Sequence, residues 1–211
     1  MTTRLLIARH GNTFGPGDVV TRVGTTDLPL VESGLEQGRM LGRFLKREGY
    51  VPDVVYVSNL QRTQQTAAEA QREMGTQITP VPLDIFNEID YGPDENKPED
   101  DVIARLGAEA LRLWDDSAAV PDGWRVDPGA IKKNWHNFAA RILKDHAGKT
   151  VLCVTSNGTA RFAPYITGDF EAFRAAHKIK LPTGAAALLE HDGTKWTCPF
   201  WGVRPQGRTA A

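Results

Sequence analysis

The sequence is poor in cysteine and carries almost no net charge. Among its 211 residues only two are cysteines, Cys153 within an apolar run and Cys198 near the end, and neither belongs to a Cys/His spacing typical of zinc sites. The formal net charge is -1, which provides no electrostatic footprint for nucleic acid or for an anionic membrane. We therefore expect neither as a partner, and any bound anion must be held by local groups.

Long hydrophobic segments are also missing. The amino terminus reads MTTRLLIARHG, too short an apolar stretch for a signal-peptide core or a membrane span. Together with the low cysteine content, this predicts a cytoplasmic protein. The length, with 41% apolar and 24% charged residues, indicates one domain over residues 1–211. Such a chain buries roughly 70% of its unfolded surface and needs no disulfide or structural metal.

Short apolar runs alternate with helical patterns along the chain. Runs typical of strands buried on both faces occur at residues 5–8, 54–57, 78–81, 151–154 and 185–189. A helix is expected from a capping box at Ser33 to Gly49, with further helices over 62–74 and 131–144. Residues 12–32 and 117–130 read as long loops. This alternation predicts an α/β fold, a three-layer α/β/α sandwich with a mostly parallel central sheet.

Residues suited to phosphoryl chemistry follow two of the expected strands. In such sheets ligands bind beyond the carboxyl ends of the strands, and His10 directly follows the first strand. A neutral imidazole can attack phosphorus if its other nitrogen is held by a hydrogen bond. Arg9 and Arg62 offer forked donors that match phosphate oxygens, and Thr13 adds a hydroxyl donor. We therefore predict a nucleophilic histidine in a phosphate pocket.

A leaving oxygen also needs a proton donor. Glu88 is the best placed carboxylate because it follows the strand expected at 78–81, and Asp90 is the second choice. Taken alone, these residue types also fit bland structural roles, since a strand-end arginine often caps a helix or pairs with a carboxylate.

The blocks taken together resemble the histidine phosphatase superfamily, the phosphoglycerate-mutase-like proteins. The match comprises Arg9 to Thr13, Gly24 with residues 27–30 and 34–37, residues 58–67, and Glu88 with Tyr91 and Gly92, in the family's order across nearly the whole chain. The resemblance implies transient phosphorylation of His10, a phosphate pocket that includes Arg9 and Arg62, and Glu88 as proton donor. It also implies that no metal and no cofactor is needed.

Asn157 departs from the family's pattern. After the fourth expected strand the family presents a second histidine followed by glycine, whereas this chain has Asn157 and Gly158, which we expect to contact the phosphate. An asparagine donates a hydrogen bond but carries no charge. A rate loss of about tenfold to a few hundredfold is therefore expected rather than inactivation.

Several other residues have two open interpretations. Arg22 is either a compensating cation or a solvated loop arginine, and Lys97 and Arg125 are candidates for substrate contacts outside the phosphate pocket. None of the remaining histidines follows a candidate strand, so surface or capping roles are expected for His136, His146, His177 and His191. Core or lid packing is expected for Trp114, Trp124 and Trp135.

The leading expectation is a metal-independent phosphatase that acts on a small phosphorylated metabolite through phosphohistidine. The first alternative is a phosphate-ligand binding or regulatory protein of the same fold, catalytically weakened by Asn157. A phosphoglycerate-type mutase ranks third, because no feature of the sequence would retain a product for retransfer. Neither the substrate nor the oligomeric state is indicated by the sequence.

Overall fold

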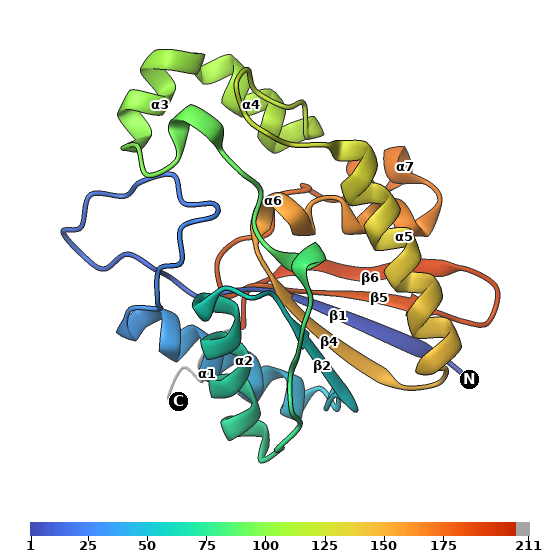
Figure 1. Ribbon diagram of the computed structural model, residues 1–211. Helices are drawn as coiled ribbons and strands as arrows, with labels where there is room; N and C mark the ends of the chain where they lie inside the picture. Colours follow the sequence, from blue (N-terminus) through green and yellow to red (C-terminus); the bar gives the residue numbers. More distant parts are fainter. Residues whose placement is uncertain (206–211) are drawn as a thin grey trace.

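The computed structural model describes residues 1–205 and is organised around a single six-stranded sheet (Figure 1). The strands are β1 (Thr3–Arg9), β2 (Val54–Val57), β3 (Val81–Pro82), β4 (Thr150–Thr155), β5 (Ala186–His191) and β6 (Trp196–Val203). The helices are α1 (Glu32–Arg47), α2 (Gln61–Met74), α3 (Glu99–Leu106), α4 (Ala108–Ser117), α5 (Pro128–Asp145), α6 (Asn157–Ala160) and α7 (Phe170–Ala176). Three 3-10 turns span Asp84–Phe86, Gly92–Asp94 and Ala163–Thr167.

The sheet is mixed but mostly parallel, as the sequence predicts. Its strand order is β3-β2-β4-β1-β5-β6. The four strands from β3 to β1 run parallel, with Leu5 opposite Val151. Strand β5 pairs antiparallel with β1, and β6 pairs antiparallel with β5. The β6 strand was not expected, because its residues are only partly buried and include Pro199.

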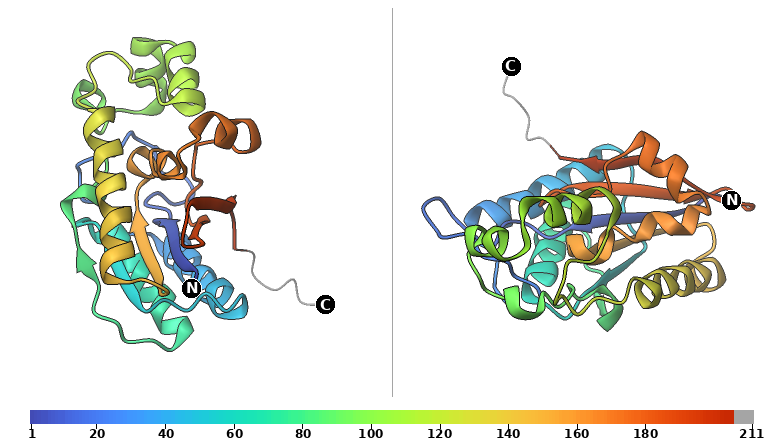
Figure 2. Two further views of the ribbon diagram at one scale, coloured as in Figure 1. Left: turned by 90° about the vertical axis from the view of Figure 1, so that its right-hand side faces the viewer. Right: turned by 90° about the horizontal axis from the view of Figure 1, so that it is seen from above.

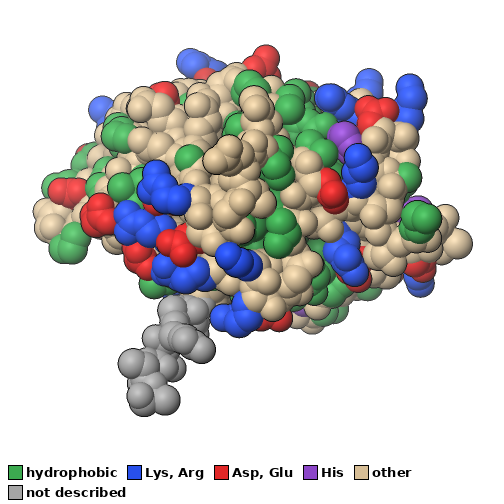
Figure 3. Space-filling view, turned by 90° about the horizontal axis from the view of Figure 1, so that it is seen from below, with side chains coloured by type: hydrophobic (Ala, Val, Ile, Leu, Met, Phe, Trp, Pro, Cys, Tyr) green, Lys and Arg blue, Asp and Glu red, His purple; other side chains and the backbone are tan. Residues whose placement is uncertain are grey.

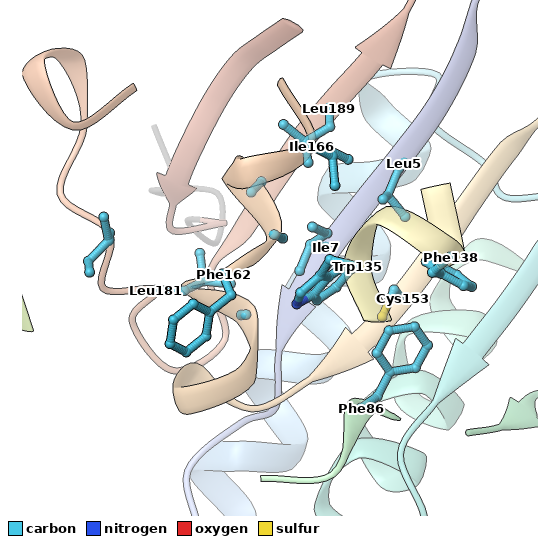
Figure 4. Packing of buried hydrophobic residues seen from close by; sticks show 14 of the residues in the cluster. Leu5, Ile7, Phe86, Trp135, Phe138, Cys153, Phe162, Ile166, Leu181 and Leu189 are labelled. Carbon is cyan, nitrogen blue, oxygen red and sulfur yellow. The ribbon is translucent and has the colours of Figure 1, made fainter. Parts of the chain in front are cut away.

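Helices cover both faces of the sheet, and alternate residues of β1 supply the two cores. Leu5 and Ile7 belong to the cluster that includes Trp135 and Phe138 of α5, as Figure 4 shows. Leu6 and Ala8 instead join the cluster formed with α1 and α2. Every residue from Leu5 to Ala8 is therefore fully buried, which explains the continuous apolar run. Burial also matches the expectation for Trp114, Trp124 and Trp135, which are 1%, 6% and 1% exposed.

The strand expected at 78–81 exists only as the two-residue strand β3, so its predicted extent is wrong. Only Val81 and Pro82 pair with β2, and both are exposed. Pro80 and Pro82 have no N–H to donate, so this segment cannot extend a ladder and remains a short edge strand.

The capping box expected at Ser33 is also wrong. Helix α1 begins at Glu32, its N-cap is Val31, and no side chain caps it. The Oγ atom of Ser33 instead accepts a hydrogen bond from Asn12 Nδ2 at 3.3 Å. Asn12 O accepts the Val31 N–H at 3.1 Å, so a contact distant in sequence fixes where this helix begins.

The other two expected helices are confirmed with shifted ends. Helix α2 begins one residue earlier than predicted and ends at Gly75, which has a φ of 75°. Helix α5 begins at Pro128, because Asp127 accepts the Ala130 N–H and caps it.

Helices α3 and α4 lie away from the α1 and α2 layer, with α3 next to the loop of residues 12–31 (Figures 1 and 2). No helix is predicted from the sequence between Glu88 and residue 117, and α3 and α4 occupy much of that segment. On the face shown in Figure 3, basic and acidic side chains are interspersed rather than separated by sign. Among residues 1–205, no helix is both long and apolar enough to span a bilayer.

Candidate active site

The segments that follow the parallel strands meet around one cavity of about 480 Å³. Arg9 and His10 come from the end of β1, Arg62 from the start of α2, and Asn157 from the segment after β4. Glu88 and Thr13 line the same cavity. The structure thus brings together six of the seven predicted site residues, all except Gly158, at the sheet edge where ligands bind in this fold class.

His10 has the environment of a neutral nucleophile. Its side chain is 6% exposed, and its Nδ1 atom lies 2.7 Å from the Gly11 carbonyl oxygen. A carbonyl can only accept, so Nδ1 carries the proton and Nε2 carries the free lone pair. Burial lowers the pKa of His10 well below its usual range, and repulsion from Arg9 and Arg62 lowers this pKa further. The ring is therefore neutral near pH 7.

Two arginines bring positive charge next to His10. Arg62 is 1% exposed and donates to the carbonyl oxygens of Thr26 and Gly24 at 2.8 and 2.7 Å. Arg9 donates from Nη1 to Leu181 O at 3.0 Å, whereas its buried Nε has no partner among the described residues. Burial is the main cause that lowers the pKa of each guanidinium, and both remain cationic. These groups leave donors available for an anion.

Glu88 is held at the cavity wall by two backbone donors. Its Oε1 accepts the Ile89 N–H at 3.0 Å, and its Oε2 accepts the Gly158 N–H at 3.1 Å. Gly158 is needed for this approach, because a Cβ atom there would lie 2.3 Å from Glu88 Oε1. Gly158 was predicted to contact phosphate, but its N–H donates to Glu88 and the residue does not line the cavity. Thr159 of α6 also donates from Oγ1 to Asn87 O at 2.6 Å, which further holds the segment around Glu88 against α6.

Asn157 is oriented by the backbone. Its Oδ1 accepts the Leu181 N–H at 2.8 Å, which assigns the other amide atom as Nδ2. Asn157 lines the cavity, and its Nδ2 has no acceptor among residues 1–205. Its two N–H donors are therefore available to a ligand.

The residues with open interpretations divide between the cavity and the surface. Arg22 lines the cavity with a side chain 17% exposed, so a freely solvated loop arginine is wrong. Asp90 pairs with Arg125 at 3.1 Å, and neither of these residues nor Lys97 lines the cavity.

The remaining histidines lie outside the cavity, as predicted. His136 is exposed on α5, and His146 and His177 are the C-caps of α5 and α7. His191 ends β5, and its Nδ1 accepts the Gly193 N–H at 3.2 Å.

Several residues of the site could not be found from the sequence. Glu95 accepts the N–H groups of Gly24 and Thr26, at 3.0 and 2.9 Å to its Oε1, and so shapes the loop that holds Arg62. Asp115 and Lys180 line the cavity from α4 and from the segment before β5. Neither belongs to a motif, and only the folded chain brings them together. Among residues 1–205 no group of three or more His, Cys, Asp or Glu has the arrangement of a metal site.

The chain is similar to known proteins in sequence and in fold. A 2,3-bisphosphoglycerate-dependent phosphoglycerate mutase from Afipia carboxidovorans is 34% identical over 200 residues, which cover 92% of this chain and 96% of the relative. The structure is similar to that of a mycobacterial glucosyl-3-phosphoglycerate phosphatase, with a TM-score of 0.76, 17% identity, and coverage of 96% of this chain and 99% of the other. It is also similar to the alpha-ribazole phosphatase from Shigella flexneri, with a TM-score of 0.71, 22% identity, and coverage of 97% and 98%. Residues 5–204 match the family described as the histidine phosphatase superfamily (branch 1), and the chain belongs to that family.

Proposed function

We propose that this protein is a metal-independent phosphatase that hydrolyses a small phosphorylated metabolite through a phosphohistidine at His10. The observation that supports it most directly is the state of His10. Its Nδ1–H is held by the Gly11 carbonyl, its pKa is depressed, and two arginines lie beside it. A neutral imidazole with a free Nε2 next to fixed positive charge is suited to attack a phosphate monoester.

The first chemical step transfers the phosphoryl group to the enzyme. Nε2 of His10 forms a bond to phosphorus while the bond from phosphorus to the ester oxygen breaks. Protonated Glu88 gives its proton to that oxygen, and the alcohol leaves. Arg9 and Arg62 neutralise the charge on the phosphoryl oxygens, and Thr13 and Asn157 donate hydrogen bonds to them.

The second step returns the enzyme to its starting state. The Glu88 carboxylate accepts a proton from water as the water oxygen attacks phosphorus. The bond between phosphorus and Nε2 breaks, inorganic phosphate leaves, and His10 is again neutral. A cavity of about 480 Å³ is within the usual range for small-molecule sites.

The decisive test compares the wild type with His10→Ala on a panel of phosphate monoesters. We expect the wild type to release phosphate and the variant to lose this activity. His136→Ala is a matched control, since His136 is exposed on α5 outside the cavity. Equal phosphate release by the wild type and His10→Ala contradicts the proposal.

Asn157 supports one alternative, a phosphate-ligand binding or regulatory protein of the same fold. In that case the wild type binds phosphate without turnover, and Asn157→His creates hydrolysis where none existed. Hydrolysis by the wild type itself excludes this alternative.

The name of the Afipia relative supports another alternative, a mutase. There the phosphohistidine passes its phosphoryl group to a second hydroxyl instead of to water. Incubation with 3-phosphoglycerate and 2,3-bisphosphoglycerate distinguishes the two outcomes, because a mutase accumulates 2-phosphoglycerate and a phosphatase accumulates inorganic phosphate.

A further inference from the structure

The cavity extends beyond the phosphate-binding residues to two ion pairs. Lys180 Nζ lies 2.6 Å from Asp115 Oδ2, and Arg22 pairs with Glu99. All four residues line the cavity. We call the part of the cavity lined by these four residues the outer cavity.

Asp115 is supported from behind by a buried cation. Arg161 is 0% exposed, and its guanidinium carbon lies 3.9 Å from the centroid of the Trp114 ring. Its Nη2 lies 3.5 Å from Asp115 Oδ1 and makes no hydrogen bond within the described part of the chain. Desolvation lowers the pKa of Arg161 to about 10, so the group remains charged near pH 7. The carboxylate is therefore held between a fixed cation inside and the more exposed Lys180.

Arg22, which pairs with Glu99, is also held in place by two aromatic rings. Its guanidinium carbon lies 5.4 Å from the ring centroids of both Tyr91 and Trp124. Trp124 in turn packs against Trp114 with ring centroids 5.3 Å apart. Neither ion pair thus depends on a substrate to be completed.

We propose, on the basis of the phosphatase function above, that the outer cavity selects esters whose alcohol part carries several hydroxyls and no carboxylate. A hydroxyl both donates and accepts, so it binds to Asp115 and Lys180 without separating them. A substrate carboxylate instead competes with Asp115 for Lys180 and with Glu99 for Arg22, because both cations are already paired. Binding it brings like charges together, which is costly at a binding site. A wholly apolar alcohol removes water from the ion pairs and makes no hydrogen bond to compensate for that loss.

Two substrates of nearly equal size test this selection. Glycerol 3-phosphate and 3-phosphoglycerate differ in one group, a hydroxymethyl where the other has a carboxylate. We expect kcat/KM of the wild type for glycerol 3-phosphate to exceed that for 3-phosphoglycerate by about tenfold or more, which corresponds to one charge-assisted hydrogen bond. Phenyl phosphate serves as the ester without hydroxyls. We expect its kcat/KM to be lower than the reactivity of its leaving group alone would give.

Substitutions in the outer cavity sharpen the test. Asp115→Asn should lower kcat/KM for glycerol 3-phosphate about tenfold and raise it for 3-phosphoglycerate. Asp116→Asn is the matched control, because Asp116 is the adjacent residue and pairs with Arg112 on the surface of α4. Lys180→Gln should also lower activity on glycerol 3-phosphate.

Failure of this inference is distinguishable from failure of the proposed function. The proposed function fails if no substrate shows phosphate release that depends on His10. The selection is measured separately with His10→Ala, which binds the substrates without turning them over. Calorimetry gives their dissociation constants, and we expect glycerol 3-phosphate to bind more tightly than 3-phosphoglycerate. Preference for 3-phosphoglycerate in the wild type, or a selective loss of 3-phosphoglycerate in Lys180→Gln, overturns the inference. An equal loss on all three substrates in Asp115→Asn overturns it as well.

Discussion

The contact between Gly158 and Glu88 makes one small substitution informative. In Gly158→Ala the new Cβ atom lies 2.3 Å from Glu88 Oε1, about 1 Å closer than ordinary contact. It also lies 2.7 and 2.9 Å from two side-chain carbons of Ile89, so the neighbours offer little free space. We expect the carboxylate to move by about 1 Å and to lose its hydrogen bond from the Gly158 N–H.

If Glu88 is the proton donor, as proposed above, a shift of this size should slow the reaction. Misplacement of a catalytic group by 1 Å reduces rates by roughly 100-fold, and loss of a general acid by about 100- to 10,000-fold. For an alkyl phosphate we therefore expect kcat/KM to fall about 100-fold or more, a barrier increase of about 2.7 kcal/mol. Overpacking should also lower the free energy of unfolding by about 1–3 kcal/mol.

The assay separates the loss of proton donation from general damage. 4-Nitrophenyl phosphate releases a good leaving group that needs no proton, so its hydrolysis should fall much less. Gly15→Ala is the control, because the nearest atom to its Cβ would be Asp18 Oδ2 at 3.5 Å. Combining Gly158→Ala with Glu88→Gln should add little to either change alone. An equal loss on both substrates in a folded variant would refute this role for Gly158.

Three further results are expected. Because the pKa of His10 is lowered in the folded protein, the folded state disfavours the protonated ring. The contribution of His10 to stability is complete above a pH of about 6.5 and is lost as the pH falls below that value. Between pH 7.5 and 5.5, urea unfolding should therefore show a smaller loss of unfolding free energy in His10→Gln than in the wild type. Arg62→Lys cannot keep both bonds to Gly24 and Thr26 and also hold phosphate, so steady-state kinetics should show kcat about 100- to 1,000-fold lower. Asn157→Leu leaves the Leu181 N–H unpaired, and chemical denaturation should show a loss of about 1–3 kcal/mol.

The parallel part of the fold was predictable because its signals are local. A strand buried on both faces must be apolar at every position, and residues 5–8 and 151–154 show this directly. Because parallel strands end at a common edge, the meeting of His10, Arg62 and Asn157 was also predictable. Elements whose boundaries depend on contacts between residues distant in sequence were not predictable.

The start of α1 shows why local signals fail. The serine and glutamate of the expected capping box are present, but Gly34 packs against the backbone of the loop after β1. A Cβ at Gly11 would lie 2.3 Å from Gly34 O, which shows how closely the two segments approach. Tertiary packing therefore overrides the cap. Likewise, the pairing of Asp115 with Lys180 joins residues 65 positions apart, and no sequence period encodes it.

Asn157 illustrates how the structure changes the meaning of a substitution. On the proposal that it stands where other members of the family carry a second histidine, the sequence suggests the loss of a positive charge. The backbone imposes a different requirement, an acceptor facing the Leu181 N–H and a donor facing the cavity. A neutral imidazole or an amide meets both needs, whereas a protonated imidazole has no acceptor for that N–H.

The consequence extends to Arg9, a residue of the proposed phosphate pocket. The Leu181 carbonyl oxygen accepts from Arg9, so one residue joins the amide of Asn157 to the arginine beside His10. An acceptor at position 157 therefore helps to place Arg9 as well as its own donor. What asparagine loses relative to a neutral histidine is reach rather than charge, so we expect Asn157→His to change kcat by less than about tenfold, a barrier difference below about 1.4 kcal/mol.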